Sequence, residues 1–390
     1  MCKIAFIRPK SIDGERRQVI LDKKVIPELF VLRCAACLSI VLLHALARVY
    51  GENEQAVNYM SLLLTFGTPV FVFISEFIIS YSYPKKQSGQ FWSKRLKFIL
   101  LPYVIFGAFY ALVKAFEVSS AKGIEYSAAA VQLLWRHILL ADYHGYFIIV
   151  IFQFYLLHSL FVKTIEPRYS PKTVIGVSLL IQLLYLGFFN FVPAPSSSAG
   201  AYIWNKFYWV PFLGWLSYFS IAFYCGKYYG EMKSWLLLRW KWVVWLPVPA
   251  AILPVVLYGM GVNEQIISKR VDMVPFVIAM IGFLFALSLK MRSVPRWIVL
   301  VSQYSFGMYL FHPFYMAVMK KAEPMIPITI HPLLLVSLYF ICGAVLSALT
   351  VSLVNLTKIG PYLVGKIGIG MNKQDTDKRS TAARPRVNEA

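Results

Sequence analysis

The stretch VLRCAACLSIVLLHALARVY, from Val31 to Tyr50, decides the fold of this chain. It is apolar and long enough to cross a bilayer as one helix, yet it carries an arginine, Arg33, and a histidine, His44. At about 3.6 residues per turn, eleven positions come close to a whole number of turns, so the two side chains share one helix face about 16 Å apart. Because a charge in hydrocarbon costs roughly 3 kcal/mol or more, we expect this face to be used or paired.

The composition is that of a polytopic membrane protein. Of the 390 residues, 58% are hydrophobic and only 15% are charged, which is far from the soluble average. The formal net charge is +21, but the basic residues gather between apolar runs and do not predict a nucleic-acid surface. The cysteines have neither zinc-site spacing nor a disulfide framework.

Ten apolar stretches of about twenty residues predict an all-α, polytopic fold with about ten transmembrane helices. They cover residues 27–49, 57–82, 97–118, 144–163, 173–193, 206–227, 241–260, 273–290, 298–319 and 332–355. If the N-terminus is cytoplasmic, 29 of the 39 Lys and Arg residues lie in inside segments, 9 lie in outside loops and their edges, and Arg33 lies in a span. The positive-inside rule therefore predicts that both termini are cytoplasmic.

We predict three parts of the chain. Residues 1–26 form a basic cytoplasmic N-terminal segment, residues 27–355 form the membrane domain, and residues 356–390 form a basic cytoplasmic tail, disordered from about residue 371. Among the outside connections, AAAVQLLWRHILL (128–140) indicates either an interfacial or re-entrant helix or a plain exposed one. The segment FVPAPSSSAG (191–200) is typical of a linker rather than a site.

The Arg33 charge has a candidate partner on the second span. Glu76, in FVFISEFIIS, and Arg33 both lie about 9 Å from the cytoplasmic ends of their helices, counted at about 1.5 Å per residue. A buried arginine and a buried glutamate at equal depth would offset each other's desolvation. This Arg33–Glu76 pair can brace two helices, bind substrate, or do both.

Three histidines fall in the outer half of the predicted bundle. They are His44, His144 at the start of the fourth span, and His312 in SQYSFGMYLFHPF of the ninth. Imidazole is a general base near neutral pH and can remove a proton from an attacking hydroxyl. The alternative is that each histidine is a hydrogen-bonded packing residue. No cluster of His, Cys, Asp and Glu has ligand spacing, so we predict no metal site.

A basic loop precedes the third span. The segment SYSYPKKQSGQFWSKRLKFILLPY holds Lys85, Lys86, Lys94, Arg95 and Lys97. As a positive-inside anchor it needs no further role. It also presents cations where the phosphates of a cytoplasmic coenzyme would arrive, so Arg95 is a candidate binding residue.

These residues resemble a known family. Arg33 and His44 with ten residues between them, in an LR-x-x-A context, are similar to the arginine-x10-histidine signature of membrane acyltransferase family 3. Four further stretches resemble family landmarks in the same order, over most of residues 27 to 355. They are GTPVFVFISEFII, FWSKRLKFILLPY, YFIIVIFQFYLL and SQYSFGMYLFHP.

One departure points to a branch of the family. Where the family usually has a glycine after serine in the second helix, this chain has Glu76. That feature resembles the branch involved in poly-N-acetylglucosamine intercellular adhesin, whose members have been assigned both O-succinylation and export.

The resemblance implies an enzyme of the bacterial plasma membrane that modifies cell-envelope polysaccharide. The expected reaction moves an acetyl or succinyl group from cytoplasmic acyl-CoA to a hydroxyl of a cell-surface or lipid-linked glycan. We expect His44 as general base and Arg33 at the donor, with Glu76 orienting Arg33. Tyr309 and His312 would line the acceptor end.

No permanently bound cofactor is predicted, and acetyl-CoA or succinyl-CoA would be the donor substrate. Membrane lipids and polysaccharide synthase proteins are the other expected partners, and nucleic acid is not one. The alternative function is an exporter or flippase of a polysaccharide such as poly-N-acetylglucosamine, for which ten spans and abundant Tyr and Trp also fit. A structural subunit of a synthase complex is a third reading, and it leaves the buried charges with only a bracing role.

Overall fold

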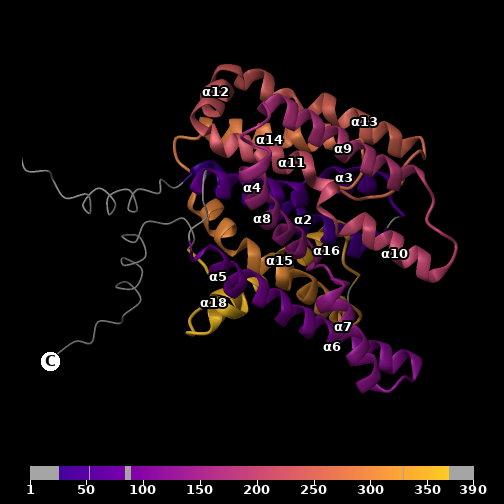
Figure 1. Cartoon of the computed structure of the whole chain (residues 1–390). Coiled ribbons are helices and arrows are strands. Elements are labelled where there is room, and N and C mark those ends of the chain that lie inside the picture. The colour runs from indigo at the N-terminus through magenta and orange to yellow at the C-terminus, as the bar shows by residue number, and fades with distance from the viewer. Residues whose placement is uncertain (1–25, 52, 84–88, 328, 369–390) are drawn as a thin grey trace, which may run out of the picture. The chain divides into compact units, whose positions relative to one another are not determined.

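The computed structural model describes residues 26–51, 53–83, 89–327 and 329–368. These residues are helical, with no strand among them, and nearly all belong to one compact unit, Pro27–Ile369 (Figure 1). The expected basic segment 1–26, except for its last residue, and the tail from residue 371 lie outside the described residues. Their predicted cytoplasmic placement and disorder stay predictions.

The elements follow one another along the chain with short connections. In order they are α2 (Pro27–Tyr50), α3 (Gln55–Leu64), α4 (Gly67–Ser82), α5 (Phe91–Arg95), the π-helix η1 (Leu96–Leu100), α6 (Leu101–Lys122), α7 (Tyr126–Leu139), α8 (Tyr146–Thr164), α9 (Pro171–Phe191), α10 (Ser198–Trp209), the 3-10 helix η2 (Phe212–Trp215), α11 (Leu216–Lys227), α12 (Tyr229–Trp245), α13 (Pro247–Gly259), α14 (Met273–Lys290), α15 (Arg296–Ala322), the 3-10 helix η3 (Glu323–Met325), α16 (Pro332–Ile341), the π-helix η4 (Cys342–Leu346), α17 (Ser347–Val354) and α18 (Gly360–Leu363).

Eight helical segments of the described chain are long and apolar enough to cross a membrane. They are Pro27–Tyr50, Gln55–Ser82, Phe91–Lys122, Tyr146–Thr164, Pro171–Phe191, Tyr229–Gly259, Met273–Lys290 and Pro332–Val354. Each overlaps one of the ten predicted spans. The all-α, polytopic membrane fold is therefore confirmed, and the orientation of its termini stays a prediction.

The other two predicted spans are built differently from expectation. Residues 206–227 do not form one helix: α10 ends at Trp209, and the chain restarts as η2 and α11. The break lies at Pro211, where ψ is 142° and the backbone is extended; proline also lacks the N–H that a continuing helix would need. The predicted span 298–319 lies within α15, a continuous helix of 27 residues. Its polar residues keep it out of the set of eight.

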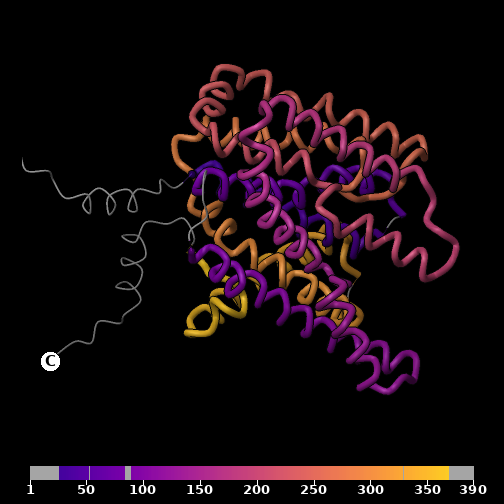
Figure 2. Tube along the Cα trace, viewed as in Figure 1, coloured from indigo at the N-terminus to yellow at the C-terminus, as the bar shows by residue number. Residues whose placement is uncertain are grey.

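Helix α2 lies in the interior of the bundle (Figure 2). It packs against α3, α4, α14, α15 and α16. Gly67, at the start of α4, allows one close approach, because an added Cβ there would lie 2.6 Å from the Ala36 carbonyl oxygen of α2. Gly226 of α11 lies as close to α4, where a Cβ would sit 2.6 Å from the carbonyl oxygen of Phe77. Helix α2 is thus held against α4 by close backbone contact as well as by side-chain packing.

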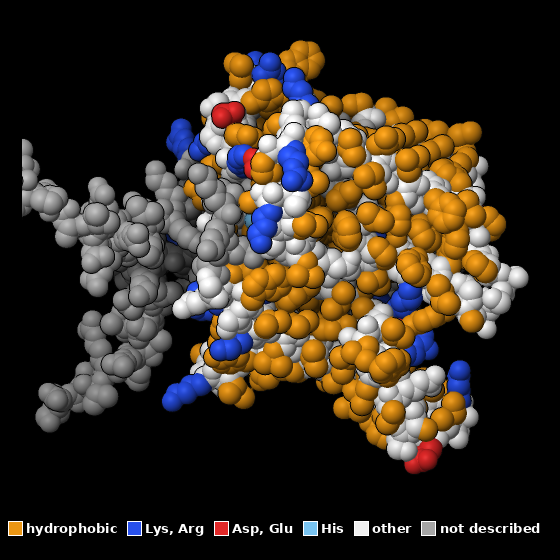
Figure 3. All heavy atoms as spheres, viewed as in Figure 1, with side chains coloured by type: hydrophobic (Ala, Val, Ile, Leu, Met, Phe, Trp, Pro, Cys, Tyr) orange, Lys and Arg blue, Asp and Glu red, His pale blue; other side chains and the backbone are white. Residues whose placement is uncertain are grey.

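The exterior is rich in apolar side chains. Figure 3 shows hydrophobic side chains over much of one face of the described residues. The most exposed include Trp242 at 83% and Leu238 at 78%, both on α12. A soluble protein rarely exposes so much contiguous apolar surface, so these side chains are expected to face lipid.

The helix ends follow local sequence signals. Ser170 caps α9 by accepting a hydrogen bond from the Thr173 N–H at 3.2 Å, and Pro171 occupies the first turn. Gly123 ends α6 with a positive φ of 65°, which favours glycine. The predicted helix in 128–140 exists as α7 and packs against α6. Whether it is interfacial or re-entrant stays open.

Candidate active site

Three histidines from distant parts of the chain meet at one end of α2, which we name the His44 end. His44 comes from α2, His312 from α15, and His144 from the turn before α8. The ring centroids of His44 and His312 are 5.2 Å apart, and those of His144 and His312 are 6.2 Å apart. His44 is exposed whereas His312 is buried. The three histidines therefore form one cluster, and its place in the outer half of the membrane stays a prediction.

The hydrogen bond of His312 fixes which of its nitrogens is free. Its Nδ1 lies 2.9 Å from the Met308 carbonyl oxygen, which can only accept, so a neutral ring carries its proton on Nδ1. Nε2 then has a bare lone pair, and it is buried without a hydrogen-bond partner in the described chain. His144 Nε2 is also buried and unpaired there. Buried polar atoms usually have partners, so two unpaired imidazole nitrogens close together indicate a site that receives a ligand.

Tyr309 supports this cluster. Its hydroxyl donates to the carbonyl oxygen of His144, and its ring centroid lies 5.6 Å from that of His144 and 6.4 Å from that of His312. Because Tyr309 uses its hydroxyl proton on the backbone, it positions the loop that carries His144. Tyr309 and His312 thus lie close together at this end, and their expected place at an acceptor site stays a prediction.

Two arginines lie at the opposite end of α2, which we name the Arg33 end. Arg33 is half-buried, and no hydrogen bond or ion pair is found for it among the residues described. Arg95 lies over the Phe91 ring at 4.4 Å and 5.6 Å from the Tyr155 ring, and its Nε is buried without a partner there. Tyr155 also interacts electrostatically with Arg33. The two guanidinium groups therefore flank one tyrosine with donors to spare.

The predicted Arg33–Glu76 pair is wrong. Glu76 Oε1 instead lies 2.6 Å from His158 Nδ1 of α8, and both side chains are almost completely buried. The reason is that equal depth of two residues in the membrane does not determine which neighbouring helix each side chain faces. Glu76 sits on a face of α4 that meets α8, and His158 reaches its carboxylate. Glu76 therefore does not orient Arg33 through a direct bond.

His158 is the residue that the sequence reasoning missed. A signal was available, because Glu76 and His158 each lie six positions before the end of their helices, Ser82 and Thr164. A buried carboxylate and a buried imidazole at one depth are as natural a pair as a carboxylate and a guanidinium.

Metal ligands are not grouped at either end. The described residues contain no set of three or more His, Cys, Asp and Glu side chains arranged to hold a metal ion. The imidazole groups at the His44 end can act as hydrogen-bond acceptors and general bases. The chemistry at the Arg33 end is that of cationic donors, which suit phosphate and carboxylate groups.

Taken together, the fold and the site define a multi-pass membrane protein with a cationic end and an imidazole end joined by one helix. The model of the acyltransferase 3 family, described as an acyltransferase domain, matches residues 26–353. The chain belongs to this family and is an acyltransferase of the cell membrane.

Curated relatives agree with this family. A protein of Bacillus subtilis (strain 168) named "Putative membrane-bound acyltransferase YfiQ" is 38% identical over 355 residues, covering 88% of this chain and 95% of the relative. A protein of Staphylococcus aureus (strain Mu50 / ATCC 700699) named "Probable poly-beta-1,6-N-acetyl-D-glucosamine export protein" is 24% identical over 299 residues, covering 75% and 82%. A Staphylococcus epidermidis protein of the same name is 24% identical over 305 residues, covering 73% and 80%. No solved structure matches the chain.

Proposed function

We propose that this acyltransferase moves an acetyl or succinyl group from acyl-CoA to a hydroxyl of a cell-surface or lipid-linked glycan. The donor binds at the Arg33 end, on the cytoplasmic side, and the acceptor binds at the His44 end, on the outer side. The observation that carries the proposal is the separation of two kinds of unpaired group along one helix. Free guanidinium donors lie at one end of α2, and free imidazole acceptors lie at the other.

Acyl-CoA suits the Arg33 end because its phosphates are multiply charged acceptors. Arg33 and Arg95 each have unused N–H donors, and guanidinium groups bind phosphate with paired hydrogen bonds. The flexible pantetheine arm of the donor then extends along α2 toward the histidines. The basic loop residues Lys94 and Lys97 add positive charge at the entrance.

At the His44 end, His44 removes the proton from an acceptor hydroxyl as its oxygen attacks the thioester carbonyl. The tetrahedral intermediate collapses, the carbon–sulfur bond breaks, and the proton returns from His44 to the CoA thiolate. His312 Nε2, which can only accept when its ring is neutral, holds a second hydroxyl of the same sugar. The products are an O-acyl sugar and free CoA, so atoms and charge balance.

The glycan is proposed from the relatives. Two relatives are named for poly-β-1,6-N-acetyl-D-glucosamine, and a polymer of this sugar, or its lipid-linked precursor, is the acceptor we propose. Polysaccharide synthase proteins would then be neighbours of this enzyme in the membrane.

The test is the transfer of radiolabelled acetyl or succinyl from its CoA thioester to envelope glycan, in membranes that hold the wild type or a variant. His44→Ala should lower transfer at least about a hundredfold, the lower end of the range for general-base catalysis. Arg33→Ala should also lose transfer, whereas His331→Ala and Arg239→Ala, on the exposed surface, should retain it. Full transfer by inserted His44→Ala protein would reject the mechanism.

Export is the second candidate, favoured by the names of the relatives that are 24% identical. An exporter needs a continuous polar path through the bundle, whereas acyl transfer needs separate donor and acceptor ends, which the unpaired Arg95 and the unpaired His144 and His312 nitrogens supply. If neither donor labels glycan, and surface glycan still disappears when the protein is absent, export is the better account.

A further inference from the structure

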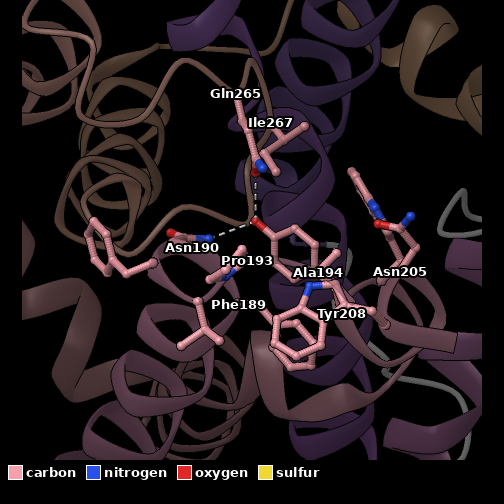
Figure 4. Close-up of a pocket in the computed structure, with 12 residues that line it drawn as sticks. Phe189, Asn190, Pro193, Ala194, Asn205, Tyr208, Gln265 and Ile267 are labelled. Carbon is pink, nitrogen blue, oxygen red and sulfur yellow. Dashed lines mark hydrogen bonds between the residues drawn. The ribbon is translucent and has the colours of Figure 1, made fainter. Parts of the chain in front are cut away.

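A pocket of about 460 Å³ opens between the end of α9, helix α10 and the segment around Gln265 (Figure 4). Trp204, Tyr208 and Trp209 of α10 supply aromatic walls, and Asn205 and Gln265 supply amides. One rim of the pocket is formed by residues 191–194, part of the segment predicted as a linker. Its size and its mixture of aromatic and polar groups are those of a small-molecule binding pocket.

The chemistry of the lining restricts the ligand. None of the described residues that line the pocket is charged. An anionic lipid headgroup or a phosphate would find no cation there, and an acyl chain would meet exposed amides. A sugar ring has an apolar face that packs on an aromatic side chain and a rim of hydroxyls that pair with amides. The lining therefore fits a neutral carbohydrate.

Several polar groups at the mouth are free to bind. In the described chain no hydrogen bond is found for the Asn205 amide or for Nε2 of Gln265, and both residues are exposed. Gln265 Oε1 does accept a bond from the Tyr208 hydroxyl at 3.2 Å, which fixes the direction of its amide. Gln265 is therefore held with its amide donors unused, and the Asn205 amide is free to turn toward a ligand.

The floor of the pocket is rigid. The Asn190 Nδ2 group donates to the Tyr208 hydroxyl at 2.8 Å and to the Lys269 carbonyl oxygen at 3.1 Å, and Asn190 Oδ1 accepts from the Val271 N–H. Figure 4 shows the Tyr208 hydroxyl between Asn190 and Gln265. The buried Nζ of Lys269 donates to the Tyr208 and Trp209 carbonyl oxygens at 2.6 and 2.7 Å. A preformed floor of this kind lowers the ordering cost of binding.

Aromatic contacts connect this pocket with the histidine cluster. The Trp209 ring lies 5.5 Å from that of Tyr146, two residues after His144. On a second route, Lys269 Nζ, which bonds the Trp209 carbonyl oxygen, lies 4.9 Å from the centre of the Trp215 ring. Trp215 of η2 lies 6.4 Å from Phe147, and Phe147 lies 6.3 Å from Tyr309. The pocket thus lies beside the His44 end, within reach of a chain of a few linked sugars.

We infer that this pocket, formed by Trp204, Asn205, Tyr208, Trp209 and Gln265, is a carbohydrate subsite that holds one sugar of an oligomeric acceptor while another sugar meets the histidines. The inference rests on the proposed function for the role of the bound glycan. It adds that the acceptor is an oligomer or polymer, because a single sugar cannot occupy both places.

The test is direct binding of a β-1,6-linked tetramer of N-acetylglucosamine to the full chain in lipid nanodiscs, without acyl-CoA, by calorimetry. Asn205→Ala and Trp204→Ala should each weaken binding about tenfold, equivalent to about 1.4 kcal/mol. Asn205 is exposed and has no structural bond among the described residues, so its variant keeps the fold even if Trp204→Ala does not. Trp242→Ala and Gln132→Ala, exposed residues outside the pocket, are the matched controls and should bind as the wild type does.

The inference is overturned if the wild type does not bind the tetramer, or if the pocket variants bind it as tightly as the controls. Binding and transfer are measured separately. A chain that binds the tetramer through this pocket but labels no glycan would retain the subsite and reject acyl transfer. If Asn205→Ala labels glycan as well as the wild type does at subsaturating tetramer, acyl transfer is retained and the subsite is rejected.

Discussion

His158 Nδ1 lies 2.6 Å from Oε1 of Glu76, and this pair joins α8 to α4 in the buried interior. Removing one partner leaves the other without compensation, and breaking a buried pair costs about 3–5 kcal/mol. We therefore expect Glu76→Ala and His158→Ala each to lower the thermal unfolding midpoint of the detergent-purified protein.

A double variant separates this bond from general packing. In Glu76→Ala/His158→Ala neither partner is left alone, so its loss of stability should be smaller than the sum of the two single losses. Strict additivity would show that the two side chains do not stabilise the fold through each other.

The free Nε2 of His312 predicts a role in acceptor binding. His312→Ala removes the lone pair that the proposed acceptor hydroxyl uses, so the KM for glycan should rise about tenfold. Steady-state transfer with a saturating donor measures this. His331→Ala serves as the control. An unchanged KM would place the acceptor elsewhere.

Arg95 should act on the donor rather than on the acceptor. Arg95→Ala removes a guanidinium held over Phe91 and should raise the KM for acyl-CoA about tenfold. Arg95→Lys keeps the charge but loses the planar guanidinium, so its KM for acyl-CoA should lie between those of the wild type and Arg95→Ala. Lys172→Ala, at an exposed position on α9, is the control. A rise in the KM for glycan instead would contradict the placement of the donor.

Lys269, in the loop between α13 and α14, predicts a pH dependence of stability. Burial holds its pKa well below the usual value of 10.5. Between the folded and unfolded pKa values the unfolded chain binds a proton that the folded chain does not, so stability rises with pH in that window.

The contribution of Lys269 to the increase of stability with pH can be measured by substitution. Lys269→Met should flatten the increase of the unfolding midpoint between neutral pH and about pH 10, where free lysine begins to lose its proton. Lys172→Met, at an exposed position, should leave the increase unchanged. Equal slopes in Lys269→Met and the wild type would show that the Lys269 pKa is not depressed.

The sequence predicted what depends on one helix and missed what depends on the packing of two. Arg33 and His44 share a face because of helical periodicity alone, and α2 spans both. The partner of Glu76 depends on how α4 is rotated against its neighbours, which depth arithmetic does not contain. The 5.2 Å approach of His44 to His312 also arises only when α15 packs on α2.

The prediction of a single span over residues 206–227 was wrong for a different reason. Residues 206–227 are apolar enough for a span, but the helix ends at Pro211, a residue that is unfavourable inside a helix and visible in the sequence. The pocket beside α10 could not be predicted, because Asn190 and Gln265 lie far apart in sequence and meet only through Tyr208. Long-range polar contacts of this kind require the fold.

The most direct test of the central claim uses sealed inside-out vesicles, because donor and acceptor are proposed to bind at opposite ends of α2. Radiolabelled acyl-CoA is added outside, where the cytoplasmic face is exposed, and labelled glycan is then tested for protection from an added glycan hydrolase. The account predicts label that is protected until detergent opens the vesicles, with none for His44→Ala. Label that is cleaved without detergent, or label that persists in His44→Ala, would contradict it.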